Sequence, residues 1–394
     1  MKEKRKYSWK LWGARICLSV FSCLIFSIQN KASEFNQKLS FESVDSLTKV
    51  LTEKKDWNGL TQLGNLALKQ NIDFSNLRLR LGIAYYELEA YRACIPHFEK
   101  VYETDKENAL VNGYLYSAYL LSGDFEKANR FGHFGKVIDY IGLNGGVKNS
   151  NLTNYFGNLI FGGIDIHNRL GKSASLFESF GDLYQKNYYG TITQWNYYVN
   201  GTFGLGKGWK ISPAFLILNY KLTNTPTWVA IENVMSEAGS LLITKRWVNM
   251  ELGITGTYSN LNNHNQGQEG IILSWYPMGN MKFCLRGEFT LQQEDEMAKQ
   301  FPMGNIRAMF QLGKRWNASL GYTYCEALYT LEGNGYLANN SPDRMNYKTN
   351  CILNYKISNH IGLMGLGQLE ERYSSPSNKT YQFVTLMGGL NLFF

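Results

Sequence analysis

Histidine is the residue type in this sequence best suited to general acid–base chemistry near neutral pH. The chain has five histidines, at His97, His133, His167, His264 and His360. His264 lies in an asparagine-rich stretch without an acidic neighbour, and His167 follows Asp165 by two residues. Hydrolysis needs a nucleophile, a base and a group that orients the base, and neither setting supplies all three. We interpret both histidines as ordinary polar residues and do not expect an enzyme.

Carboxylates and thiols give no stronger case for a site. The acidic run Glu294–Glu296 could bind a divalent cation, although a solvated loop is the simpler interpretation. Cys94, Cys284, Cys325 and Cys351 are widely spaced and form no CxxC pair. The sequence also lacks a phosphate-binding loop and zinc-ligand spacing. We therefore expect no metal and no cofactor.

The first elements along the chain are helical. Apolar residues recur with a helical period from about 40 to 135, which predicts six short helices, at 41–54, 57–70, 75–89, 91–103, 108–122 and 124–135. Within them, Tyr85 is followed 34 residues later by Tyr119. This spacing resembles the tetratricopeptide repeat, which implies paired antiparallel helices and a concave docking surface. The residues that the resemblance places between the helices are Leu81, Gly82, Tyr85, Cys94, Phe98, Tyr119 and Ala128. A spacer that only seats the following region is the alternative.

From about residue 137 the apolar period changes to two, which is typical of strands. The pattern predicts fourteen strands, at 137–148, 154–168, 173–187, 191–204, 209–222, 235–246, 247–260, 266–277, 280–293, 303–313, 316–330, 344–357, 360–373 and 379–394. Segments 173–187 and 235–246 alternate weakly, so twelve strands is the alternative. The last strand ends on Phe394 and resembles the closing strand of bacterial outer-membrane barrels. Taken alone, it also fits the edge of a soluble sandwich.

The connections favour the barrel. Short turns alternate with longer loops such as NLNNHNQGQ, QQEDEMAKQF and LEGNGYLANNSPDR, and an even strand count returns both ends of the barrel to the short-turn side. Three short turns place a basic residue shortly before a tryptophan that opens a strand. Cation and aromatic residues of this kind anchor proteins at a membrane–water boundary. The predicted anchors are Trp209, Trp247, Trp316 and Phe394.

The N-terminus predicts a targeting segment. Residues 1–32 carry seven Lys or Arg against one Glu and contain the apolar run Ile16–Ile28, which is typical of a secretory signal. A short membrane anchor is the alternative. Most of the formal net charge of +8 therefore belongs to this segment, and nucleic acid is not an expected partner. The predicted domains are a signal at 1–32, a periplasmic repeat domain at 33–136 and an outer-membrane barrel at 137–394.

This α+β multidomain arrangement, a helical head before an antiparallel barrel, resembles outer-membrane exporters of bacterial exopolysaccharides and the related YaiO-type family. The resemblance implies a pore or export component whose head binds a periplasmic protein or polysaccharide. Further implied partners are outer-membrane lipid, lipopolysaccharide and the barrel-assembly machinery. A non-conducting scaffold or surface-binding protein is the alternative, and a hydrolase at the barrel rim a remote one.

Strand alternation places a set of charged side chains inside the predicted lumen, with cations in excess. The set is Lys282, Arg286, Arg307, Lys348 and Lys356, with Glu251 and Glu288. A channel lined by one sign of charge concentrates ions of the other sign, so we expect anionic or neutral polar cargo. Cations that pair with the lumen acids and merely maintain the barrel shape are the alternative.

Overall fold

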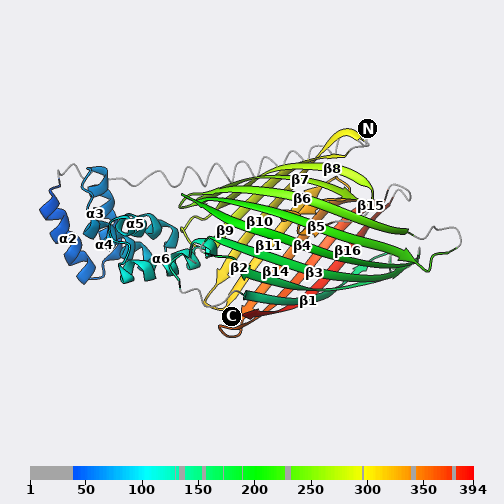
Figure 1. The fold of residues 1–394 in the computed structure, drawn as a ribbon, viewed down its shortest axis with the longest axis horizontal. Helices are drawn as coiled ribbons and strands as arrows, with labels where there is room; N and C mark the ends of the chain where they lie inside the picture. Colours follow the sequence, from blue (N-terminus) through cyan, green and yellow to red (C-terminus); the bar gives the residue numbers. More distant parts are fainter. Residues whose placement is uncertain are drawn as a thin grey trace, which may run out of the picture.

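The computed structural model describes residues 39–394 except 129, 133–137, 153–156, 172, 189, 227–231, 295–296, 339–342 and 375–378. It consists of a helical head and a barrel of strands, and the head lies at one end of the barrel (Figure 1). We call this end of the barrel the head side and the opposite end the far side. The predicted signal at 1–32 lies outside the described residues.

The head is built from short helices. They are α2 (Phe41–Glu53), α3 (Trp57–Lys69), α4 (Ser75–Glu87), α5 (Tyr91–Thr104), α6 (Ala109–Leu121) and α7 (Phe125–Ala128). Helices α2, α4 and α6 begin at residues 41, 75 and 109, which is every 34 residues. Ser40, Asp56 and Asn108 cap their helices by accepting hydrogen bonds from backbone N–H groups in the first turn.

The first five predicted helices are confirmed, whereas the sixth, predicted at 124–135, extends only over Phe125–Ala128. The N–H groups of Arg130 and Phe131 donate to carbonyls three residues back, and this tighter turn ends the helix. Residues 129 and 133–137 lie outside the described residues.

The predicted packing residues lie in the head core. Leu81, Cys94, Phe98, Tyr119 and Ala128 are buried and Tyr85 packs against them. A Cβ at Gly82 would lie 2.6 Å from the Phe98 ring, so only glycine lets α4 approach α5 this closely. The structure thus places the seven residues between the helices, and the tetratricopeptide assignment stays a prediction.

Fourteen strands of the described chain form a closed antiparallel barrel, and two more form a separate pair. The barrel strands are β1 (Ile138–Ser150), β2 (Asn158–Arg169), β3 (Ala174–Asn187), β4 (Gly190–Gly206), β5 (Trp209–Thr223), β6 (Glu232–Arg246), β7 (Met250–Leu261), β8 (His264–Trp275), β9 (Phe283–Glu294), β10 (Met297–Leu312), β11 (Trp316–Cys325), β14 (Arg344–Lys356), β15 (Ile361–Ser374) and β16 (Lys379–Phe393). The two weakly alternating segments form β3 and β6, which excludes twelve strands.

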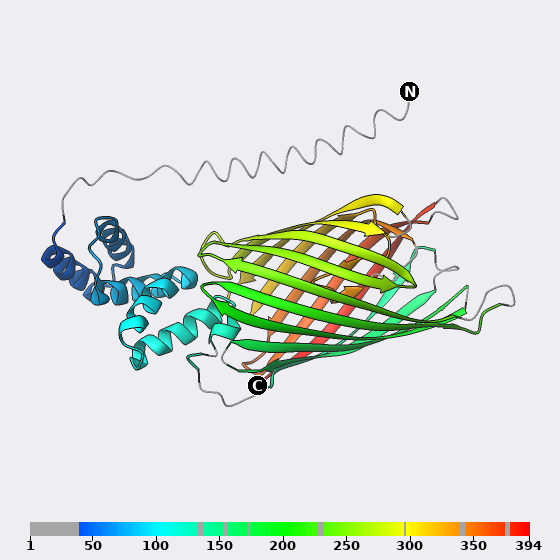
Figure 2. The same ribbon diagram turned by 45° about the horizontal axis from the view of Figure 1, so that its top comes forward.

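The last strand closes the ring, as predicted. β16 pairs with β1 from Tyr140 opposite Phe393 to Ser150 opposite Phe383. The backbone N–H of Phe394 donates to the carbonyl of Asp139 at 3.1 Å. The chain therefore ends on the head side, where the first strand begins (Figure 2).

The outside of the barrel is apolar and its inside polar. On β7, Ile254 and Tyr258 are each 63% exposed, whereas Ser259, which alternates with them, is 2% exposed. This pattern inverts that of a soluble protein and fits a barrel that faces lipid. Among the described helices, none is both long and apolar enough to cross a bilayer.

Three predicted boundaries on the far side are wrong. The stretch NLNNHNQGQ is not a loop, because β7 and β8 continue to a two-residue turn at Asn262 and Asn263, whose positive φ values of 52° and 63° asparagine tolerates. β9 and β10 likewise extend through QQEDEMAKQF and leave only 295–296 between them. The strand predicted at 316–330 ends at Cys325, because the chain there turns away from the barrel wall.

Candidate functional site

The segment after β11 folds into the barrel instead of outward. The Tyr336 hydroxyl lies 3.2 Å from Asp165 of β2, and the Gln292 amide of β9 donates to the Leu328 carbonyl at 2.6 Å. Glu332 forms an ion pair with Lys348 of β14. Since β2, β9 and β14 lie on different sides of the ring, one segment can reach all three only inside the lumen. We call residues 326–338 the plug.

A tight hairpin forms the deepest part of the plug. Strands β12 (Leu331–Glu332) and β13 (Leu337–Ala338) flank a turn in which Gly333, Asn334 and Gly335 all have positive φ. Glycine and asparagine are the residues that adopt this conformation at the lowest cost. Asn334 donates to the Ser212 carbonyl at 3.0 Å, three residues from the head-side start of β5. The tip of the hairpin therefore reaches the head-side half of the lumen.

One side of the plug packs against an aromatic wall. The Tyr336 ring meets those of Phe177 and Tyr198 at centroid distances of 5.6 and 5.3 Å, and the Tyr329 ring stacks on His264 at 5.0 Å. Leu331 belongs to the same buried cluster. These contacts fix the position of the plug in the lumen.

The other side of the plug faces charged groups. Arg344 contacts the Glu326 carbonyl, and Glu294 accepts from the Leu328 N–H at 3.1 Å. On the neighbouring wall, the Glu370 carboxylate binds both Lys148, at 3.0 Å, and Arg372. Some lumen ion pairs thus lie within the wall, and others hold the plug to it.

At the head-side mouth, Asp124 fastens the head to the barrel. This residue precedes α7 and is 2% exposed. Its carboxylate lies 3.0 Å from Lys210 of β5, 3.4 Å from Arg246 of β6 and 3.8 Å from Lys127 of the head. Burial alone would raise the pKa of Asp124, but these cations outweigh it and hold the pKa below its usual value. Asp124 is therefore ionised and paired with two strands.

Arg92 makes a second junction between head and barrel. Its backbone N–H donates to the carbonyl of Gly279 in the β8–β9 turn at 2.9 Å. Its guanidinium lies 3.3 Å from the centroid of the Tyr276 ring. Asn280 of the same turn donates to the Glu89 carbonyl at 2.9 Å. Burial and the nearby Arg246 lower the pKa of Arg92. With Asp124, these contacts fix the head to the part of the head-side rim formed by β5, β6 and the β8–β9 turn.

The sequence-predicted lumen residues divide into two groups. Arg286, Glu288, Arg307 and Lys348 lie on the inward faces of their strands, and Glu251 points inward at the head-side mouth, 2.7 Å from Arg246. Lys282 and Lys356 do not line the lumen. Lys282 lies in the turn before β9 and pairs with Glu89 of the head, and Lys356 is the exposed last residue of β14. Lys282 thus precedes the start of β9, and Lys356 lies at the very end of β14, where its side chain is exposed at the rim.

The predicted interface anchors are exposed aromatic residues at the head-side end of the barrel. Trp209 and Trp316 open β5 and β11, Trp247 lies in the β6–β7 turn, and Phe394 ends the chain, each about half-exposed. Lys245 Nζ lies 5.1 Å from the ring centroid of Trp209 and 5.9 Å from that of Trp247. This cation and its two indoles have the character of a membrane-boundary anchor.

The residues first considered for chemistry have other roles. His167 lies 3.4 Å from Asp139, and Asp165 instead binds the plug. Glu294 is buried on the lumen side, so its part of the acidic run is not a solvated loop. The rest of that run lies outside the described residues. Within the described chain, no three His, Cys, Asp or Glu side chains gather as metal ligands would.

Sequence reasoning missed Asp124, Arg92 and Glu332. Asp124 follows Gly123 in what looked like a polar connection, and Glu332 lies in an apparent far-side loop. One signal was available, because that loop contains Leu331, Tyr336 and Leu337, apolar residues that an outer loop has no reason to carry.

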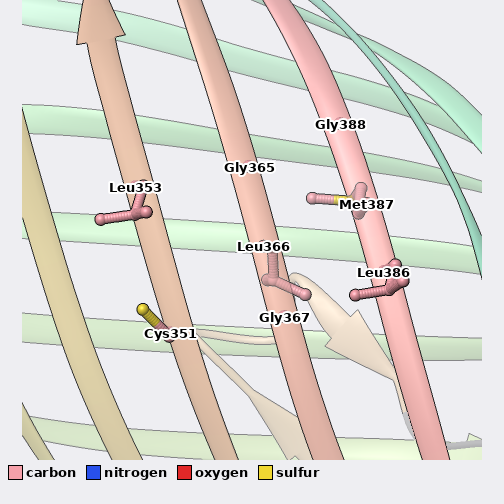
Figure 3. Close-up of a pocket in the computed structure, with 8 residues that line it drawn as sticks. All are labelled: Cys351, Leu353, Gly365, Leu366, Gly367, Leu386, Met387 and Gly388. Carbon is pink, nitrogen blue, oxygen red and sulfur yellow. The ribbon is translucent and has the colours of Figure 1, made fainter.

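A shallow groove of about 480 Å³ lies on the outer wall rather than in the lumen (Figure 3). Leu353 and Leu386 flank it, and Gly365 and Gly388 form its floor. It arises where adjacent strands carry glycine on the lipid side, and it has almost no polar lining.

No family model and no curated protein matches this sequence. Several solved structures resemble this one in fold. The CymD monoaromatic hydrocarbon channel is 8% identical over 72% of this chain and 91% of its own, with a TM-score of 0.47. The toluene transporter TbuX of Ralstonia pickettii is 9% identical over 69% and 94%, with a TM-score of 0.43. A FadL homologue of Pseudomonas aeruginosa is 8% identical over 68% and 92%, with a TM-score of 0.43. What these structures share with this chain is the barrel fold.

Proposed function

We propose that this protein is a transport component of the bacterial outer membrane, closed at rest by the plug and by its head. The apolar outside of a complete barrel supports the location, with the head in the periplasm. The observation that carries the transport proposal is the way in which the lumen is closed. A hairpin with polar and ionic contacts occupies it, and such contacts exchange for water or for cargo at lower cost than a dry apolar core.

The head is proposed to bind a periplasmic partner and to control the mouth. The 34-residue interval of its helices and the exposed apolar side chains Phe41, Leu47 and Leu110 support a docking role. Because Asp124 and Arg92 connect the head to barrel turns, a partner that moves the head would also move the mouth. An anionic or polar polymer such as a polysaccharide is the proposed cargo, supported by the excess of lumen cations.

Two engineered disulfides test the gates separately. A Cβ at Gly335 would lie 3.6 Å from that of Ser240, and a Cβ at Gly279 would lie 4.0 Å from that of Ala90. Both distances suit a disulfide. Ser240→Cys with Gly335→Cys should lock the plug, and Ala90→Cys with Gly279→Cys should lock the head. In planar bilayers we expect each oxidised pair to abolish channel openings and reduction to restore them.

A plug-free variant supplies the decisive comparison. Replacing residues 330–338 by a short glycine–serine link should give a large steady current that favours anions and that an anionic polysaccharide blocks from the head side. Absence of current from this variant would contradict transport. An unblocked current, together with normal secreted glycan after deletion of the gene, would contradict export.

A non-conducting scaffold is the second candidate. It is favoured by the plug, which occupies the lumen, and by the head, which is attached to the barrel independently of the plug. A barrel held in this way needs no cargo to be stable. A silent plug-free barrel that still binds its partner through the head would support it.

A further inference from the structure

We infer that Glu332 of the plug occupies a binding site for anionic ligands on the lumen wall, and that carboxylate-bearing solutes release the plug by displacing it. This deepens the transport proposal above and rests on it. The site consists of Lys348, Arg307 and Arg286 on β14, β10 and β9.

The wall carries more positive charge at this place than its own carboxylates balance. Arg307 lies directly opposite Arg286 in the β9–β10 pairing. Like charges at directly paired positions destabilise a sheet. Glu288, the next inward residue of β9, attracts both arginines, and the wall carboxylate opposite Lys348, Glu370, is already shared by Lys148 and Arg372. An arrangement that costs stability in the empty barrel needs an anion to offset it.

Two polar atoms at the site have no hydrogen-bond partner among the described residues. The Arg307 Nε–H is buried without a hydrogen-bond partner, and so is the Oδ1 atom of Asn350 in the same cross-strand row. Gly321 lies between them, and a Cβ at this position would lie 2.7 Å from Asn350 Oδ1. A ligand that offers both an anionic oxygen and a hydroxyl would satisfy both groups.

The plug supplies a substitute for such a ligand. Glu332 pairs with Lys348 and also attracts Arg307 across the lumen. Because the plug is part of the chain, the Glu332 carboxylate can neutralise these cations without an anion from solution. A solute with a carboxylate and neighbouring hydroxyls, such as a uronic acid or a polymer of one, has the chemistry to compete for these cations.

The rate at which a thiol at the plug tip is labelled measures the competition between Glu332 and an added ligand. This measurement does not depend on conduction. Gly335 is buried against Ser240, so a thiol introduced by Gly335→Cys should react slowly with a bulky hydrophilic maleimide in the full-length protein. Wild-type protein gives the background from the native cysteines. We expect glucuronate and oligoglucuronate to raise the labelling rate about tenfold, as loss of one charged hydrogen bond implies, and glucose to leave it unchanged.

Substitutions separate a specific site from simple screening. Glu332→Gln in the Gly335→Cys background should raise labelling about tenfold without ligand and remove the response to glucuronate. Glu326→Gln is the matched control, because it removes a plug carboxylate that accepts from the Tyr324 hydroxyl, and it should keep the response. Lys348→Gln should also lose it. Equal stimulation by potassium chloride at the same ionic strength, or labelling that ignores both Glu332→Gln and glucuronate, would overturn the inference. A barrel that releases its plug but stays silent would instead contradict the transport proposal alone.

Discussion

At the scale of single residues, one carboxylate joins two parts of the molecule. Asp124 belongs to the head, yet Lys210 and Arg246 belong to the barrel. Removing one partner from a buried ionic cluster leaves the other charges uncompensated, which makes such residues sensitive to substitution.

We expect Asp124→Asn to weaken the junction by about 3 kcal/mol. The Arg92 amide reports this directly, since it donates to Gly279 across the junction, and its hydrogen exchange should accelerate. Because the pKa of Asp124 lies below 3.8, the contribution is present above about pH 4 and is lost as the pH falls through the folded-state value. Asp73→Asn removes the half-exposed pair with Arg78 and should cost less than about 1 kcal/mol. Equal exchange in both variants would contradict the role of Asp124.

A histidine makes the head sensitive to mild acid. Burial and the neighbouring Arg78 lower the pKa of His97 to about 4 from its ordinary 6.5, so the folded head favours the neutral ring. Its contribution is complete above pH 6.5 and declines as the pH falls towards 4. Between pH 7.5 and 5.5 we expect the head to lose about 1 kcal/mol of stability, measured by hydrogen exchange in α4 and α5. His97→Gln should flatten this dependence, and an unchanged slope would contradict it.

At the scale of elements, close packing of α4 on α5 explains why residue 82 is glycine, and Gly113 provides the control. Gly82→Ala would drive a Cβ into the Phe98 ring, and we expect it to destabilise the α4–α5 pair by about 1–3 kcal/mol. Gly113 of α6 has no atom within 4 Å of its would-be Cβ, so Gly113→Ala should stabilise the head by about 0.5–1 kcal/mol. Thermal unfolding compares the two, and equal effects would show that packing is not the cause.

At the scale of the whole molecule, the barrel depends on its two ends meeting. The Phe394 amide donates to Asp139 beside the first strand, and its ring lies on the aromatic head-side boundary. We expect deletion of Phe394 to lower the amount of protein assembled in the outer membrane several-fold, measured by surface labelling of cells. Phe394→Tyr keeps the ring and the backbone bond and should assemble normally. Normal surface levels of the truncated protein would contradict this role.

Much of the fold could be predicted from local pattern. Helix and strand periods identified five of the six helices and all fourteen barrel strands, because one face of a helix recurs about every 3.6 residues and one face of a strand every second residue. The same alternation placed Arg286, Arg307 and Lys348 on the inward faces of their strands. Boundaries failed on the far side, where β7–β8 and β9–β10 continue past the residues that resembled loops.

The apolar period, the order of the elements and the aromatic closing strand can be read from local sequence alone, since each depends on neighbours within a few residues. What fills the lumen, and how the head attaches to its rim, depends on the folded chain as a whole. Glu332 pairs with Lys348 because the closed barrel surrounds the plug, and Asp124 pairs with Arg246 because the head docks on the barrel. No short-range spacing records such contacts, because residues far apart in the chain become neighbours only once the barrel has closed.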